Sequence, residues 1–338
     1  MNNPPAASDV KPAPEPEVIP FPEGFDFTHR RNALGIAVEE DRITVLQALV
    51  SGKEISVTGA DEEKFESGVV REGRIANQQA LVEAFRQIKK RAKLNAVVAS
   101  INIPSHFLSM KEFDVPAGYF APDNDNLQWE MSQHVNAEAD SLCIKSVEVG
   151  EGKLGRKSIA VASRAGLIEE RAKLLTALGL SPSAVEPDIV AAFNALSVIF
   201  LDFPAENFLI VDISAPFTSF GMAVKGVFVP GGYFNTPREV LHGEDGSFEL
   251  AQKLTLSFNK HFAVHGFTLG KKSPDMMMAC GRFAETYLVS QVGNYMNLHI
   301  FEGDPFKSSW VDVSKLKTSV PWQRLIKPFG MAMRSPYD

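Results

Sequence analysis

Hydrophobic and polar positions alternate in an order that occurs twice along the chain. In the first half, the β-prone runs ALGIAV, RITVLQALV and KEISVTG are separated by short polar turns, which predicts a three-stranded meander. A helix is predicted over 77–93, and its apolar side chains share one face: Leu81, Ala84, Phe85, Ile88 and Ala92. The second half repeats this order, with a meander over 207–234 followed by the helical pattern SFELAQKLTLSFNKHFA. The repetition predicts a two-lobed α/β fold, although a duplicated fold without a functional cleft has the same pattern.

A block between the two halves has its own alternation of strands and one helix. Strands are predicted over 95–104, where Pro104 ends the run, and over 109–116. A helical composition over 125–139 and the runs CIKSVEVG and KSIAVASR complete a small β-α-β-β unit. An amphipathic helix over 166–180 then ends at Gly179, and an apolar helix with Asp188 near its start follows. We therefore predict a separate subdomain inserted into the first lobe.

These patterns predict the following division of the chain. The segment 1–30 is rich in Pro, Ala and Glu, which favours an extended, disordered tail. The predicted domains are the first-lobe core over 31–94 and 181–206, the inserted subdomain over 95–180, the second lobe over 207–320, and a C-terminal return helix and tail over 321–338.

Composition excludes several classes of protein. The 338 residues are 45% hydrophobic and 22% charged, with a net charge of −7 and no basic stripe, which excludes a dedicated nucleic-acid surface. Cys143 and Cys280 are far apart and are interpreted as buried reduced thiols. His261 and His265 share a helical face, but without a third ligand they are interpreted as packed or solvated rather than as a metal site.

The sequence also predicts how the protein reaches a membrane. The N-terminal segment has no cationic start followed by an apolar stretch, so we do not expect a signal peptide. The longest apolar run, over 189–201, is interrupted by Asn194 and is shorter than the roughly 20 residues that span a bilayer. Any membrane contact is therefore expected to pass through a partner protein.

Read together, several segments resemble the PilM family, the actin-like cytoplasmic proteins of bacterial type IV pilus assembly, over residues 32–334. ALGIAVEEDRITVLQAL stands where the family has its first phosphate hairpin, and FLIVDISAPFTSFGMAVKGVFV stands at the second. VVASINIPSHFLSMKEFDVP and LQWEMSQHV resemble the start and the Trp-Glu helix of the family's inserted subdomain. MMMACGRFAETYL occupies the position of the adenosine motif, and LIKPFGMAMR resembles the closing helix. The resemblance implies a bilobal actin-like (ribonuclease H-like, duplicated) fold with an inserted subdomain of the FtsA and PilM type.

The first phosphate hairpin departs from the family pattern. In an actin-type cleft, two tight hairpins hold the phosphates with backbone N–H groups, which requires Gly or Ser for close approach. Gly35 is kept, but Ala37 replaces the family's Asp, and Glu39, Glu40 and Asp41 stand at the Gly and Ser positions. Three carboxylates facing a triphosphate repel it by about 1 kcal/mol each in a partly wet cleft. This hairpin is therefore not expected to bind ATP well without a bridging cation.

The other two nucleotide motifs have drifted as well. In the second hairpin Asp212 is kept, Ser214 replaces a Gly, and Thr218 matches the downstream hydroxyl. The Gly-rich adenosine turn is reduced to Gly281, followed by Arg282 and Phe283. The residues Gly35, Asp212, Ser214, Thr218 and Gly281 are thus the candidates for a vestigial or weak ATP site.

Each candidate also has a purely structural interpretation, which we favour. Asp212 then caps a turn at the end of a buried strand, and Gly281 is a turn residue at a helix entry. The acidic EED tip is interpreted as a solvated hairpin tip rather than a magnesium site. We therefore expect no catalytic residues, no protein metal site, and neither ATP nor Mg²⁺ as a cofactor, with a weak ATP·Mg²⁺ site as the alternative.

The resemblance implies a function in assembly. A PilM-like protein is a cytoplasmic scaffold, peripheral at the inner membrane through its partners, and it could form a homo-oligomer or ring. It binds the N-terminal peptide of a PilN-like single-pass inner-membrane protein, a role that suits a groove between the first lobe and the inserted subdomain.

Four alternatives remain beside this interpretation. The first is an active ATP-binding actin-like protein of pilus, secretion or division machinery. A sugar kinase or phosphatase of the same superfamily needs the missing hairpin Asp and Gly residues and a general base. An FtsA-like division protein ends in an amphipathic membrane helix, whereas this chain ends in KPFGMAMRSPYD. A relative similar to the L component of secretion systems continues into a transmembrane helix, which is absent here.

Overall fold

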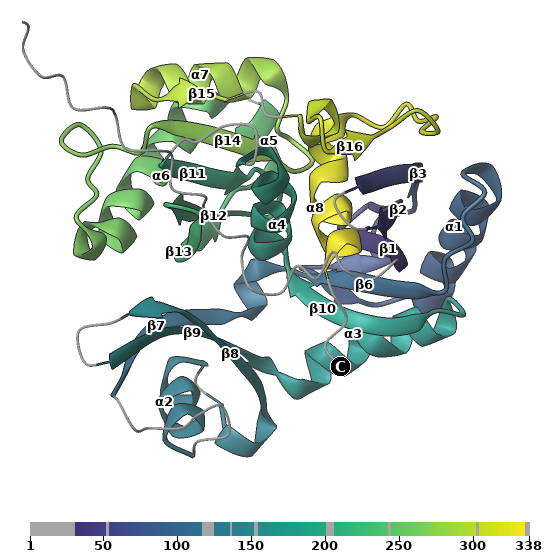
Figure 1. Cartoon of the computed structure of the whole chain (residues 1–338), viewed down its shortest axis with the longest axis horizontal. Coiled ribbons are helices and arrows are strands. Elements are labelled where there is room, and N and C mark those ends of the chain that lie inside the picture. The colour runs from purple at the N-terminus through teal and green to yellow at the C-terminus, as the bar shows by residue number, and fades with distance from the viewer. Residues whose placement is uncertain are drawn as a thin grey trace, which may run out of the picture.

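A computed structural model of the protein describes residues 31–51, 54–116, 125–135, 137–151, 155–200, 206–242, 245–301 and 304–334. The predicted tail over 1–30 lies outside these residues. The chain forms two lobes and a smaller subdomain that lies below them in Figure 1. The order of elements in each lobe follows the repeated pattern of the sequence.

The first lobe is built on a six-stranded sheet with the order β10-β6-β1-β2-β3-β16. The first three strands form an antiparallel meander, whereas β6 and β10 continue the sheet in parallel. Its strands are β1 (Arg31–Val38), β2 (Arg42–Ser51), β3 (Glu54–Lys64), β6 (Val98–Ile103), β10 (Ser181–Pro187) and β16 (Val311–Asp312). A short hairpin of β4 (Val70–Arg71) and β5 (Arg74–Ile75) precedes the first helix.

The second lobe repeats this architecture in a five-stranded sheet with the order β13-β12-β11-β14-β15. Again an antiparallel meander is extended by two parallel strands. The strands are β11 (Asn207–Asp212), β12 (Phe217–Val224), β13 (Val227–Asn235), β14 (Met276–Cys280) and β15 (His299–Ile300). Helices α5 (Arg238–His242), α6 (Gly246–Phe262) and α7 (Thr286–Met296) belong to this lobe. The predicted duplication is therefore confirmed in the topology of both sheets.

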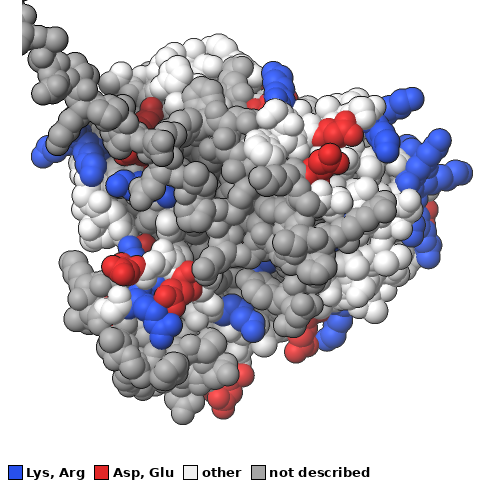
Figure 2. Space-filling model, in the orientation of Figure 1, with Lys and Arg blue, Asp and Glu red and all other residues white. Residues whose placement is uncertain are grey.

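Helix α1 (Gln78–Arg91) shows how closely the pattern predicted local structure. Its first turn is capped by Asn77, whose side chain accepts a hydrogen bond from the backbone N–H of Ala80 at 3.2 Å. The predicted apolar face is buried against the first sheet, while three basic residues lie in the last turn. Figure 2 shows Lys and Arg side chains gathered at the edge of the molecule where α1 lies.

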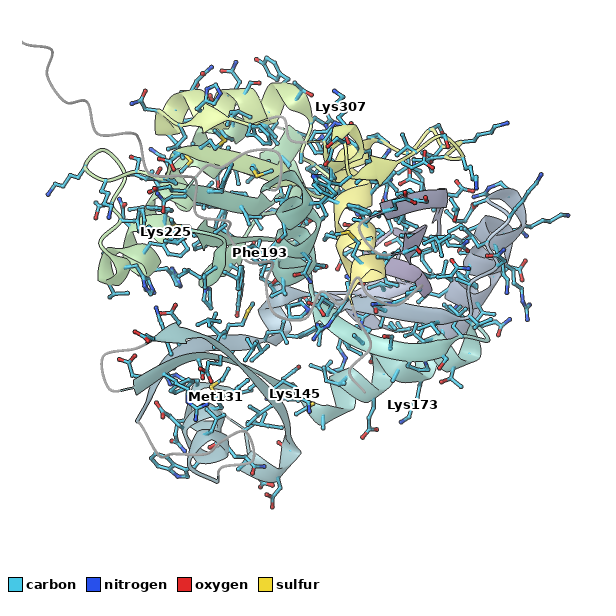
Figure 3. The ribbon with its side chains drawn as sticks, viewed as in Figure 1. Met131, Lys145, Lys173, Phe193, Lys225 and Lys307 are labelled. Carbon is cyan, nitrogen blue, oxygen red and sulfur yellow. The ribbon has the colours of Figure 1, made fainter. Side chains whose placement is uncertain are left out.

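The inserted subdomain is smaller than predicted. It consists of a three-stranded antiparallel sheet with the order β7-β9-β8 and one helix. The elements are β7 (Ser109–Pro116), α2 (Asp125–Val135), β8 (Leu142–Glu151) and β9 (Gly155–Arg164). Met131 of α2, labelled in Figure 3, is buried in a cluster with Ala160 and Ala162 of the sheet.

The predicted boundaries of this subdomain, 95 and 180, are wrong at both ends. Strand β6 pairs with β1 in the first sheet, and helix α3 (Ala165–Ala177) packs its leucines into the first-lobe core. The segment SPSAVEP, which lies between two predicted helices and for which no strand was predicted, is the edge strand β10. The insertion therefore extends from about β7 to β9.

Two helices lie between the sheets and join the lobes (Figure 1). Helix α4 (Asp188–Phe200) packs on β11 and β12 of the second lobe, and α8 (Trp322–Met333) packs on β1 and β2 of the first. One apolar core contains residues of both helices and of both sheets. Phe193 of α4, labelled in Figure 3, contacts the ring of Phe228 at 5.3 Å between centroids. No helix in the described part of the chain is long and apolar enough to cross a bilayer.

Candidate functional site: a cleft with internal cations

The two hairpins that correspond to phosphate loops meet at a buried lysine. Glu39 follows β1 in the first lobe, and Asp212 ends β11 in the second. The ammonium group of Lys327, from α8, lies 2.9 Å from Glu39 Oε1 and 3.1 Å from Asp212 Oδ2. Its side chain is only 3% exposed. A single side chain thus binds acids from both lobes at the centre of the cleft.

A third carboxylate completes the lysine's surroundings. Asp188 begins α4, where an acid is favoured by the helix dipole, and its Oδ1 lies 3.7 Å from Lys327 Nζ. The amide of Asn102, just inside the end of β6, donates to this oxygen at 3.0 Å. The side-chain oxygen of Asn102 accepts a hydrogen bond from the backbone N–H of Val38 at 2.7 Å. Asn102 therefore fixes the aspartate against the end of β1.

Close backbone contacts allow Lys327 to reach this position. A Cβ on Gly330 would lie 1.8 Å from the carbonyl oxygen of Ala191 in α4. A Cβ on Gly35 would lie 1.7 Å from the carbonyl oxygen of Pro328 in α8. Gly35, predicted as a nucleotide contact, thus serves the seating of α8 on β1. Its register partners, Leu46 and Ser100, place it inside the sheet rather than at the hairpin tip.

The tip of the first hairpin is not solvated, contrary to our interpretation of its acids. The side chain of Asp41 is 21% exposed and that of Glu39 is 14% exposed. Asp41 pairs with Arg282 of the second lobe at 2.5 Å and with its neighbour Arg42 at 3.3 Å. Arg238, also from the second lobe, approaches it at 3.8 Å. Two of the three acids that were expected to repel a triphosphate, Glu39 and Asp41, are thus paired with the protein's own cations. The third, Glu40, has a buried Oε1 without a hydrogen-bond partner among the described residues.

Four of the five predicted site residues are brought together. Ser214 Oγ donates to Asp212 Oδ1 at 2.8 Å, which satisfies the oxygen that does not contact Lys327. Gly281 adjoins the same carboxylate and has a φ of +98°, a conformation that favours glycine. Thr218 is buried, and its hydroxyl donates to the carbonyl oxygen of Ser214 at 3.4 Å. The hydroxyls and the glycine therefore support Asp212, while Gly35 lies elsewhere.

The open space in the cleft is small. A cavity of about 50 Å³ is lined by Lys327, by acids from both lobes and by the ring side chains of His106, Phe217 and Tyr233. This volume holds a few water molecules, whereas pockets for drug-sized ligands measure roughly 300–1,000 Å³. The small volume and the internally paired acids do not fit an ATP·Mg²⁺ complex, so we assign no chemistry to one.

The charge balance of the cleft perturbs its ionisable groups. Burial alone would lower the pKa of Lys327, but the carboxylates of Asp188, Asp212 and Glu39 raise it well above its usual value. Burial raises the pKa of Asp212 to about 6; Lys327 opposes this shift, and the charges of Asp188 and Glu39 add to it. Burial likewise raises the pKa of Asp188. Three acids around one ammonium therefore leave an excess of negative charge.

This excess predicts a pH dependence of stability. Because folding raises the pKa of Asp212 from 3.8 to about 6, the folded state binds its proton more tightly than the unfolded chain. This contribution to the free energy of unfolding is fully present below pH 3.8, the pKa in the unfolded chain, and it is lost as the pH rises to about 6. The loss amounts to at most about 3 kcal/mol. We expect Asp212→Asn to remove this slope in urea denaturation between pH 4 and pH 7. The exposed control Glu83→Gln should keep it, and an equal slope in Asp212→Asn would refute the assignment.

Sequence reasoning missed the residues that organise the cleft, which are Lys327, Asp188, Asn102 and Arg282. One signal was available, because Lys327 stands in the closing helix within the apolar stretch LIKPFGMAM. Every residue from Leu325 to Met333 is buried. A lysine in such a run must meet carboxylates or other acceptors.

The two histidines that share a helical face each contact a different group. His261 Nδ1 lies 2.8 Å from the carbonyl oxygen of Ser257, and His265 pairs with Glu112 of β7 at 3.7 Å. No cluster of potential metal ligands occurs among the residues that the structure describes. Both cysteines are free; Cys280 is buried as predicted, whereas Cys143 is only partly buried.

Two lobes with the same strand order, whose hairpins face each other across a central cleft, define an actin-like protein with an inserted subdomain. The family described as type IV pilus assembly protein PilM matches residues 35–229, more than half of the chain. The chain therefore belongs to the PilM family. No curated protein matches its sequence.

Three solved structures are similar to the chain over most of its length. A PilM-PilN type IV pilus biogenesis complex is similar over 90% of this chain and 97% of that one, with a TM-score of 0.72 and 15% identity. The cytoplasmic domain of EpsL, from the type II secretion system of Vibrio cholerae, is 13% identical over 88% of this chain and 93% of that one, with a TM-score of 0.48. Ethanolamine utilization protein EutJ from Carboxydothermus hydrogenoformans is 13% identical over 93% of each chain, with a TM-score of 0.46. Only the first of the three similarities is strong enough to support the fold.

Proposed function

We propose that this PilM family member is a cytoplasmic scaffold of a type IV pilus. In this proposal it binds the N-terminal peptide of a PilN-like single-pass inner-membrane protein, and it lies at the inner membrane only through that partner. The observation that carries the scaffold role is the pairing of the cleft acids with Lys327 and Arg282, which leaves a cavity too small for a nucleotide. The partner is suggested by the similarity of the whole fold to PilM in a PilM-PilN complex.

The inserted subdomain offers strand edges to an extended peptide. Strands β7 and β8 are the outer strands of its sheet, and β10 is the outer strand of the first-lobe sheet. None of these edges pairs with a further strand within the described residues. An extended peptide can add to such an edge through main-chain hydrogen bonds, while pockets for alternate side chains provide specificity.

Calorimetry tests the proposal directly. The purified protein is titrated with a synthetic N-terminal peptide of its PilN-like neighbour, in the absence and presence of ATP and Mg²⁺, with a scrambled peptide as control. We expect the native peptide to bind and the scrambled peptide not to bind. The affinity of the native peptide should be the same with and without ATP and Mg²⁺. Absence of peptide binding would overturn the partner assignment. Micromolar binding of ATP that strengthens peptide binding would overturn the assignment of a degenerate cleft.

A further inference from the structure

We propose that the Lys327 ammonium group is a built-in cation that holds the two lobes together without a bound ligand. This inference concerns how the cleft is closed, and it does not depend on the identity of the pilus partner.

The path of the chain makes Lys327 a connection between lobes. Helix α8 packs on β1 and β2, so the lysine is anchored to the first lobe. Its ammonium group nevertheless contacts Asp212, at the end of the central strand of the second lobe, as well as Glu39 of the first. If the lobes separated, the ammonium group would lose one of these carboxylates. Lobe closure and the neutralisation of buried charge are therefore coupled.

A second set of ion pairs crosses the cleft in the opposite sense. Here the acid, Asp41, belongs to the first lobe, and the cations Arg282 and Arg238 belong to the second. The side chains of Asp41 and Arg282 are 21% and 17% exposed, so they are more open to solvent than Lys327. Salt screens exposed pairs more strongly than buried ones. Lys327 is accordingly the contact that should persist at high ionic strength.

The position of the lysine suits a cleft that closes without a ligand. In an actin-type cleft, phosphates and a cation lie between the two hairpins, and here the ammonium group takes that place. Three carboxylates surround it at 2.9, 3.1 and 3.7 Å. Without the lysine, these buried acids would have no cation at the centre, and separation of the lobes would let water reach them. The degenerate motifs of this chain thus come with a compensating residue.

The test combines a distance measurement with chemical rescue. Spin labels are placed at Val97 of the first lobe and Val264 of the second, which are 65% and 83% exposed, in a Cys143→Ala background that keeps the buried Cys280. Pulsed electron resonance then gives the distance distribution between the lobes. We expect one narrow distribution for the parent protein, unchanged by ATP and Mg²⁺. Lys327→Met should give a broader distribution with longer distances.

Rescue distinguishes a cation from a space-filling side chain. Lys327→Ala removes atoms that correspond to n-propylammonium, so this amine should restore the narrow distribution and raise the Tm. Sodium chloride at the same ionic strength should not restore the narrow distribution, and Lys327→Met, which fills the space, should not respond to the amine.

If Lys327→Ala folds only with the amine present, that result also supports the proposal. If Lys327→Met does not fold, the double variant Lys327→Met with Asp212→Asn replaces it, and we expect a broadened distribution. An unchanged narrow distribution in either methionine variant, or an equal response of Lys327→Ala to amine and salt, would overturn it.

Discussion

Replacing Gly330 with alanine is expected to lower the free energy of unfolding by about 3 kcal/mol, the upper part of the range for overpacked cores. The added Cβ would lie 1.8 Å from the carbonyl oxygen of Ala191 and 3.0 Å from the backbone nitrogen of Ala195. These are backbone atoms of α4, so no side-chain rotation can relieve the contact. Helix α8 must move away from α4, and Lys327, one turn earlier, moves with it. Urea denaturation followed by circular dichroism measures the effect.

Gly166→Ala provides the matched control for a glycine-to-alanine change in a helix. Gly166 lies in the first turn of α3, and a Cβ there would meet no atom within 4 Å. Alanine at an unhindered helical position stabilises a protein by roughly 0.4–1 kcal/mol. The two variants should therefore change stability in opposite directions. Equal effects would show that α8 and α4 do not pack as closely as the structure indicates.

Alternation of apolar and polar residues was enough to predict the two meanders and α1. In each meander consecutive strands are neighbours, so local pattern and spatial order coincide. The parallel strands were harder to place because their partners are distant in sequence. Strand β6 follows α1 yet pairs with β1, and this long-range pairing led to the wrong boundary at residue 95.

Strand β10 shows a second limit of sequence pattern. Its sequence, SPSAVEP, contains two prolines and a glutamate, which are typical of a connection. Prolines are tolerated there because β10 is an edge strand. Glu186 is fully buried despite its charge and accepts a hydrogen bond from Asn194 at 3.3 Å. Such tertiary pairing cannot be predicted from the residues of one segment.

The candidate site was predicted from its acids but not from its cations. Glu39 and Asp212 could be singled out from the sequence because the resemblance places them in the two phosphate hairpins. Lys327 is 288 residues from Glu39 in sequence and corresponds to no nucleotide motif. Only the fold, which returns α8 to β1, brings them together. The same acids can repel a nucleotide or bind an internal cation, and the difference depends on this contact.

Gly281→Ala is the second substitution with a large expected effect, again about 3 kcal/mol of lost stability. Part of the cost arises because its φ of +98° is unfavourable for alanine, a penalty of roughly 1–2 kcal/mol per residue. The remainder arises because the new Cβ would lie 2.1 Å from Asp212 Oδ1 and 2.8 Å from the carbonyl oxygen of Ile213. Asp212 must rotate, which breaks its contact with Lys327. Thermal and urea denaturation at pH 7 measure the loss.

Gly266→Ala separates these two causes. Gly266 has a φ of +78°, but a Cβ there would meet no atom within 4 Å. This variant should show only the backbone penalty, so the difference between the two variants measures the contact with Asp212. Gly281→Ala should also weaken the pH dependence between pH 4 and pH 6, because the displaced carboxylate is better solvated, whereas Gly266→Ala should leave it unchanged. Equal losses and identical pH profiles would mean that Gly281 serves only its own turn and does not position the carboxylate that joins the lobes.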